Sequence, residues 1–266
     1  MSDKTIVAPA SAPGRGGVSV IRMSGADSKE IAENMCGSLA DSWKFKKCNI
    51  KSLDGTVLDN GLVVFFKSPH SYTGEDVVEF HCHGNPTIVN LIVEDAVKRG
   101  AVIAEPGEFT KNAFLNDKID LAQAESVADL INAQSKSAVI AANSSLSGNF
   151  SSSVNLIIEG LVRTRVVVEA HIDFPEEEIG SGLLDNISRE LSGFSKDIDS
   201  LLAEAVKSMK LRESYRVCIV GLPNAGKSTL LNTIAKESLA ITSGTPGTTR
   251  DLIRAEIDLG GVVVEF

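Results

Sequence analysis

The residues Gly221 to Ser228 read Gly-Leu-Pro-Asn-Ala-Gly-Lys-Ser and match the phosphate-loop pattern Gly-x-x-x-x-Gly-Lys-Ser/Thr. Gly221 and Gly226 allow the backbone to curl so that successive N–H groups point at phosphate oxygens, next to the positive end of a helix. Lys227 is expected to neutralise the β and γ phosphates, and the Ser228 hydroxyl is expected to bind Mg²⁺. The alternative is an ordinary glycine turn that joins a strand to a helix.

A second polar, glycine-rich segment follows at residues 243–251, with the sequence Ser-Gly-Thr-Pro-Gly-Thr-Thr-Arg-Asp. Neither helix nor strand propensity explains it. A loop of this kind opposite a phosphate loop can give Mg²⁺ a second hydroxyl and reorder when the γ-phosphate is lost. Thr249 is the candidate ligand, with Thr248 beside it. A plain connecting loop is the alternative.

The run His81-Cys82-His83 invites a metal-site interpretation. In a strand, His81 and His83 share one side and Cys82 points to the other, and the sequence offers no evident fourth ligand. The pattern therefore favours no metal site here.

These groups need elements to position them, and the chain supplies two kinds. Short β-branched runs bounded by Gly, Pro or Asn predict strands at 5–7, 18–22, 61–66, 77–81 and 102–104. Apolar residues at helical spacing predict helices at 28–36 and 86–99. The first 115 or so residues are therefore predicted to form an α+β domain.

From Asp120 onward the apolar period becomes helical for about 95 residues. Asp120 and Gln123 stand at the two positions of a capping box, and a long helix is predicted through 154–170. A further apolar stripe is expected to face other helices; its residues are Leu184, Ile187, Leu191, Phe194, Ile198 and Leu201. A strand at 217–220 and a helix at 229–235 flank the phosphate loop.

Composition narrows the class of protein. The 266 residues carry 26 Lys and Arg against 35 Asp and Glu, a net charge of -9, so the chain as a whole is no basic nucleic-acid-binding arm. Its four cysteines lack CxxC spacing, and its N-terminus lacks the apolar core of a secretory signal. A cytoplasmic protein without a membrane anchor is expected.

Several separated motifs together resemble the MnmE (also called TrmE) family of tRNA-modification GTPases. The motifs lie at 5–8, 13–25, 71–84, 106–125, 174–178, 224–228 and 247–251, in the order found in that family. The resemblance implies a tetrahydrofolate-binding and dimerisation domain at 1–118, the first part of a helical domain at 119–213, and the N-terminal part of an α/β phosphate-loop GTPase domain at 214–266.

The resemblance also implies a folate site. The family's folate contacts fall on Arg22, Glu79 and Lys118, and the implied ligand is a 5-formyl or 5,10-methylene tetrahydrofolate. A carboxylate suits the amide-like edge of a pterin ring, while cationic side chains suit the glutamate tail or carbonyl groups.

The implied nucleotide is GTP with Mg²⁺ and K⁺. Mg²⁺ is assigned to Ser228 and Thr249, and K⁺, which replaces an arginine finger, to Asn224, Ser243, Thr245 and Thr248. The nucleotide-binding residues implied are Asn224, Ala225, Gly226, Lys227, Ser228, Thr229, Ser243, Gly244, Thr245, Pro246, Gly247, Thr248 and Thr249.

The implied reaction adds a carboxymethylaminomethyl or aminomethyl group to C5 of the wobble uridine, position 34, of certain tRNAs. It needs a homodimer and an FAD-dependent partner of the MnmG (GidA) type in a heterotetramer. A ribosome-assembly GTPase is an alternative, but it leaves the first 120 residues unexplained. A folate-binding module without turnover and a dimerisation scaffold are the others.

The GTPase unit is expected to be incomplete, because no Asn-Lys-x-Asp motif follows and the family's switch II would lie beyond Phe266. The family's C-terminal helical half is also absent. No catalytic residue is therefore assigned, and this polypeptide alone is expected to bind guanine nucleotide weakly without turnover.

Overall fold

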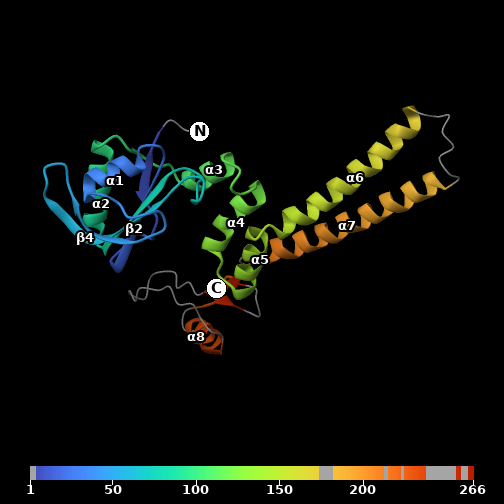
Figure 1. Cartoon of the computed structure of the whole chain (residues 1–266). Coiled ribbons are helices and arrows are strands. Elements are labelled where there is room, and N and C mark those ends of the chain that lie inside the picture. The colour runs from blue at the N-terminus through green and yellow to red at the C-terminus, as the bar shows by residue number, and fades with distance from the viewer. Residues whose placement is uncertain (1–3, 174–181, 213–214, 223–224, 238–255, 259–262) are drawn as a thin grey trace. The chain divides into compact units, whose positions relative to one another are not determined.

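The structure is a computed structural model that describes residues 4–173, 182–212, 215–222, 225–237, 256–258 and 263–266. The chain divides into two compact units, Met1–Ala124 and Glu125–Phe266. The predicted fold class is confirmed: an α+β unit comes first, long helices follow, and a mixed strand and helix part comes last. Figure 1 shows these parts in chain order.

The first unit is built on a six-stranded sheet of order β3-β4-β5-β2-β1-β6. The strands are β1 (Ile6–Pro9), β2 (Gly16–Ser24), β3 (Lys46–Lys51), β4 (Val57–Phe66), β5 (Val77–Gly84) and β6 (Val102–Ile103). Only the β1–β6 pair is parallel within this sheet. The central strands β5 and β2 therefore have partners on both edges, and their side chains alternate between the two faces of the sheet.

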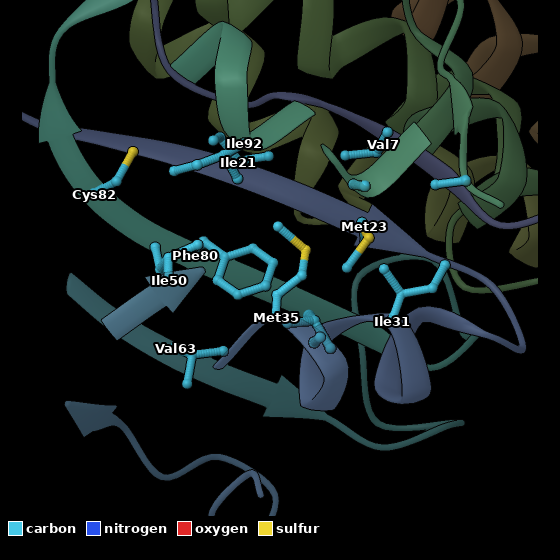
Figure 2. Packing of buried hydrophobic residues seen from close by; sticks show 14 of the residues in the cluster. Val7, Ile21, Met23, Ile31, Met35, Ile50, Val63, Phe80, Cys82 and Ile92 are labelled. Carbon is cyan, nitrogen blue, oxygen red and sulfur yellow. The ribbon is translucent and has the colours of Figure 1, made fainter. Parts of the chain in front are cut away.

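One face of this sheet packs against α1 (Ser28–Cys36) and α2 (Pro86–Lys98). Phe80, Ile21, Met23, Met35 and Ile92 lie between sheet and helices, and all are fully buried (Figure 2). Burial of each such side chain contributes about 1.5–3 kcal/mol. This core fixes which residues of β2 and β5 point to the opposite face.

Two elements of the first unit were not predicted. The strand β3 has only Cys48 and Ile50 as buried apolar residues among polar ones, and it lies at the sheet edge. The helix α3 (Glu108–Leu115) is short, with Asn112 and Ala113 as its buried residues. Both follow from tertiary packing rather than from a strong local pattern.

The helices of the second part are α4 (Leu121–Asn132), α5 (Lys136–Leu146), α6 (Asn149–Asp173) and α7 (Leu183–Arg212). The two long helices α6 and α7 lie side by side (Figure 1). The Thr164 hydroxyl donates to Glu190 Oε2 at 2.9 Å, and a Cβ at Gly160 would lie 2.5 Å from the Phe194 ring. Glycine at 160 therefore lets the two helices approach closely.

The apolar stripe predicted on α7 faces another helix only in part. Ile187, Phe194 and Leu201 are half-buried, whereas Leu184, Leu191 and Ile198 are exposed. The half-buried residues repeat every seven positions, which is the spacing of a narrow seam between two helices. The prediction that the whole stripe is covered is wrong for the described residues.

The last part has α8 (Lys227–Glu237) and a three-stranded sheet of order β7-β9-β8, with β7 (Tyr215–Arg216), β8 (Glu256–Asp258) and β9 (Val263–Glu265). The predicted strand at 217–220 is wrong, because these residues have no regular structure. The pairing of β7 with β9 joins Tyr215 to Val264 and Arg216 to Glu265, and the Val217 N–H donates to the Glu265 carbonyl at 2.8 Å. The strands β8 and β9 pair antiparallel, and residues 259–262 between them lie outside the described residues.

Candidate functional site

Arg22 and Glu79 form the centre of the candidate folate site. They are direct cross-strand partners of β2 and β5, on the sheet face opposite the helix-covered core. The Arg22 Nε donates to Glu79 Oε1 at 2.8 Å. Their side chains are 24% and 15% exposed, so this ion pair is partly shielded from water. The structure therefore brings two of the three predicted folate residues into contact.

Two aromatic rings flank Arg22. Its guanidinium lies 4.9 Å from the centre of the Tyr72 ring and 5.6 Å from that of Phe109. The Tyr72 hydroxyl is hydrogen-bonded to the Thr110 hydroxyl at 2.8 Å. Cation–π attraction and this hydrogen bond fix the guanidinium between the Tyr72 loop and α3, so the unpredicted helix α3 contributes to the site.

The loop that carries Tyr72 is anchored to both β2 and the segment after α3. The Ser24 hydroxyl, at the end of β2, lies 2.6 Å from the Thr73 hydroxyl and donates to Glu75 Oε2 at 2.7 Å. The Asn116 amide donates to the Thr73 carbonyl at 2.7 Å. Thr73 is fully buried, so the loop has a defined position beside Arg22.

Lys118 contacts this same loop. Its ammonium donates to the Pro69 carbonyl at 2.9 Å, and a Cβ at Gly74 would lie 3.0 Å from Lys118 Cγ. Gly74 has a φ of +78°, which favours glycine. Lys118 thus joins the site through the loop, while Arg22 and Glu79 touch each other directly.

His81 lies beside Glu79 on β5, and no folate role was predicted for it. Its Nε2 lies 3.5 Å from Glu79 Oε2. The Nε2 atom is buried and has no hydrogen-bond partner, and the Phe45 ring meets the imidazole edge to face at 5.1 Å. Phe45 is 36 residues away in sequence, so no local pattern signals this environment.

His83 and Asp59 form a separate pair at the end of β5. The Asp59 carboxylate accepts the His83 backbone N–H at 2.7 Å and the His83 ring nitrogen Nδ1 at 2.8 Å. Burial opposes ionisation of Asp59, but the bonds from His83 and from the Asn60 N–H outweigh it and lower the pKa of its carboxyl. No cluster of three His, Cys, Asp or Glu side chains suited to a metal occurs among the residues that the structure describes.

The phosphate loop is described in part, at 221–222 and from Ala225 onward. The helix α8 begins at Lys227, and the Leu230 N–H donates to the Gly226 carbonyl at 2.9 Å. Gly226 has a φ of +81°, and the Lys227 ammonium donates to the carbonyls of Gly221 and Leu222 at 2.9 and 2.8 Å. The helix begins directly after a glycine with positive φ, and the Lys227 ammonium lies against the loop backbone. Both features are those expected of a loop that binds phosphate.

The remaining predicted nucleotide and metal residues lie outside the described residues. They are Asn224, Ser243, Gly244, Thr245, Pro246, Gly247, Thr248 and Thr249. Ala225, Gly226, Lys227, Ser228 and Thr229 are described. No helix in the described part of the chain has the length and apolar character needed to cross a bilayer.

An α+β unit followed by long helices and a phosphate-loop sequence is the order of parts that the resemblance to the tRNA-modification GTPases implies. Comparison with known proteins agrees with it. Residues 5–118 match the family described as GTP-binding protein TrmE N-terminus, and residues 121–260 match the MnmE helical domain. The chain belongs to the MnmE (TrmE) family.

Curated relatives extend the match along the chain. The tRNA modification GTPase MnmE of Neisseria gonorrhoeae is 46% identical over 268 residues, covering 100% of this chain and 60% of the relative. The protein of the same name from Hydrogenovibrio crunogenus is 46% identical over 261 residues, covering 98% of this chain and 58% of the relative. The chain therefore spans about three-fifths of the length of these relatives.

Proposed function

We propose that this chain provides the folate-binding and nucleotide-binding parts of a GTPase that modifies C5 of the tRNA wobble uridine, position 34. The Arg22–Glu79 pair, at 2.8 Å on the sheet face opposite the helix-covered core, is the observation that carries the proposal. A phosphate loop alone would suit many GTPases, including one of ribosome assembly. The match of residues 5–118 to the TrmE N-terminus favours the tRNA-modification alternative.

The chemistry of the pair suits a reduced folate. Glu79 Oε1 is engaged by Arg22, and a carboxylate has further lone pairs for the paired N–H groups of a pterin edge. Arg22 and Lys118 supply positive charge for a carbonyl or the glutamate tail. Lys118 reaches the site through the Pro69–Gly74 loop. A tetrahydrofolate carrying a 5-formyl or 5,10-methylene group would supply the carbon that becomes bonded to C5 of the uridine.

Lys227 and the start of α8 are the proposed triphosphate site. The N–H groups of Ser228 and Thr229 belong to the first turn of α8, where they have no partner within the helix. Ser228 is proposed to bind Mg²⁺ together with Thr249. Asn224, Ser243, Thr245 and Thr248 are proposed to bind K⁺, so that no arginine has to neutralise the transition state.

Assembly and domain bounds complete the proposal. The domains are 1–118 for folate and dimerisation, 119–213 for the helical part and 214–266 for the GTPase part. The protein is proposed to act in the cytoplasm as a homodimer with an FAD-dependent partner of the MnmG type. The net charge of -9 agrees with a partner that supplies much of the tRNA-binding surface.

The test is the nucleoside composition of bulk tRNA. A strain that lacks the complete gene should lose the wobble-uridine modification, measured by nucleoside mass spectrometry. The complete gene should restore it, and so should a Lys98→Ala gene, which changes an exposed lysine of α2. Genes with Arg22→Ala or Lys227→Ala should not. An unchanged nucleoside profile in the deletion strain would overturn the proposal.

A further inference from the structure

We propose that His81 is a positioning residue of the folate site, which acts by holding the second carboxylate oxygen of Glu79. This inference rests on the proposed folate function. Glu79 lies between two side-chain nitrogens: Arg22 Nε is 2.8 Å from Oε1, and His81 Nε2 is 3.5 Å from Oε2. The first contact is a hydrogen bond, and the second stands at the outer limit of one.

The buried Nε2 atom of His81 is the observation that points to a role. It has no hydrogen-bond partner, although buried polar atoms in proteins nearly always have one. The acceptor that faces it is Glu79 Oε2, at 3.5 Å. A small shift of the Glu79 carboxylate toward His81 would turn this contact into a hydrogen bond, and ligand binding at Glu79 is the event that would fix the carboxylate there.

The imidazole is held in place from several directions. The Phe45 ring meets it edge to face at 5.1 Å, with the ring planes at 89°. Val20 of β2 and Leu62 of β4 are its direct cross-strand neighbours. A Cβ at Gly61 would collide with the His81 carbonyl oxygen, so β4 and β5 approach closely at this point. The imidazole ring therefore has a defined position beside the Glu79 carboxylate.

When the protein bonds both oxygens of Glu79, lone pairs remain on each oxygen for a ligand. An ionised carboxylate offers about four lone-pair sites, so each oxygen of Glu79 can accept one bond from the protein and one from a ligand. A heterocycle with two adjacent N–H donors, as at an amide-like pterin edge, can bond both oxygens only when the carboxylate lies in the plane of the heterocycle. Arg22 fixes one oxygen through its hydrogen bond, and the hydrogen bond proposed to form from His81 would fix the other, so that the two together would set the orientation of the carboxylate.

The test is isothermal titration of the 266-residue chain with 5-formyltetrahydrofolate. His81→Leu, which removes the donor, should weaken binding about tenfold, the loss expected for one hydrogen bond to a charged group. His81→Gln carries an N–H donor at similar reach and should bind within about threefold of the parent. His81→Asn is one methylene shorter and should resemble His81→Leu. Rescue by Gln and not by Asn is a result that a purely structural role would not give.

Two comparisons separate the possible failures. His171→Gln changes an exposed histidine of α6 in the other unit and should bind like the parent. If Glu79→Gln loses binding while His81→Leu and His81→Asn bind like the parent, the inference is overturned and the folate function stands. If the parent chain itself does not bind, the folate function fails and the inference fails with it. Circular dichroism confirms that each variant is folded, and the Gln and Asn variants decide the question if His81→Leu is not.

Discussion

Asp59 of β4 and His83 of β5 are joined through one carboxylate, which accepts both the His83 backbone N–H at 2.7 Å and its ring nitrogen at 2.8 Å. The Asp59 side chain is 8% exposed, and that of His83 is 69% exposed. The buried carboxylate of Asp59 therefore holds the end of β5 in place, while the His83 ring that it binds is exposed to solvent.

Acid should weaken this link. The bonds from His83 lower the folded-state pKa of Asp59 against the opposing effect of burial, so its stabilising contribution is complete above the ordinary carboxyl value of 3.8. The contribution is lost as the pH falls from that value through the lower folded-state pKa. Asp59→Asn should cost about 1–3 kcal/mol at pH 7 and show a smaller loss of stability on acidification. Urea unfolding at pH 7, 4 and 3 checks this, and an equal acid dependence in parent and variant would contradict it.

The thiols of Cys82 and Cys218 should react at very different rates. Burial, with the nearby Asp59 charge, raises the pKa of Cys82 to about 11, whereas Cys218 is exposed. Since the thiolate is the nucleophile, iodoacetamide at pH 7.5 should label Cys218 within minutes and leave Cys82 unmodified in the folded chain. Peptide mass spectrometry measures both sites, and the denatured chain is the control. Early labelling of Cys82 in folded protein would show that the sheet core is more open than described.

The Phe80 side chain should dominate the stability of the first unit. It is fully buried between the sheet and α1 and α2 (Figure 2). Phe80→Ala should cost about 3–5 kcal/mol, because the residual cavity adds to the lost transfer free energy. Phe150→Ala, at a side chain that is 45% exposed, is the matched control and should cost much less. Denaturant titration followed by circular dichroism compares them, and similar losses for both would be inconsistent with the core.

Local signals predicted much of the fold. The helix α1 has the predicted bounds, because Ile31, Ala32 and Met35 face the core at helical spacing. The capping box at the start of α4 is confirmed in both directions: the Asp120 N–H donates to Gln123 Oε1 and the Gln123 N–H to Asp120 Oδ1, each at 2.9 Å. In each case the residues that carry the signal lie within one or two turns of the same helix.

Features that depend on distant partners were missed. The strand β3 is defined by its pairing with β4 and not by its own residues. The wrongly predicted strand at 217–220 has β-branched residues, but β7 ends at Arg216, the last residue that pairs with β9. Strand propensity describes suitability for a sheet and carries no information about whether a partner is present.

The site shows the same limit. Arg22, Glu79 and Lys118 were predicted as folate residues through family resemblance, and the folate role stays a prediction. Their geometry depends on tertiary contacts that sequence does not reveal: Phe109 beside Arg22, the Pro69 carbonyl at Lys118, and the buried nitrogen of His81. The helix α3 positions Phe109, so a site contact was missed together with the element that carries it.

The most direct test of the account is isothermal titration of this chain with 5-formyltetrahydrofolate, comparing the parent with Arg22→Ala. The account predicts saturable binding by the parent and affinity at least about tenfold weaker for Arg22→Ala, which removes the bond to Glu79. Arg216→Ala, which breaks a pair with Glu265 in the other unit, should bind like the parent. Equal affinity of Arg22→Ala and the parent would contradict the central claim that this pair forms the folate site.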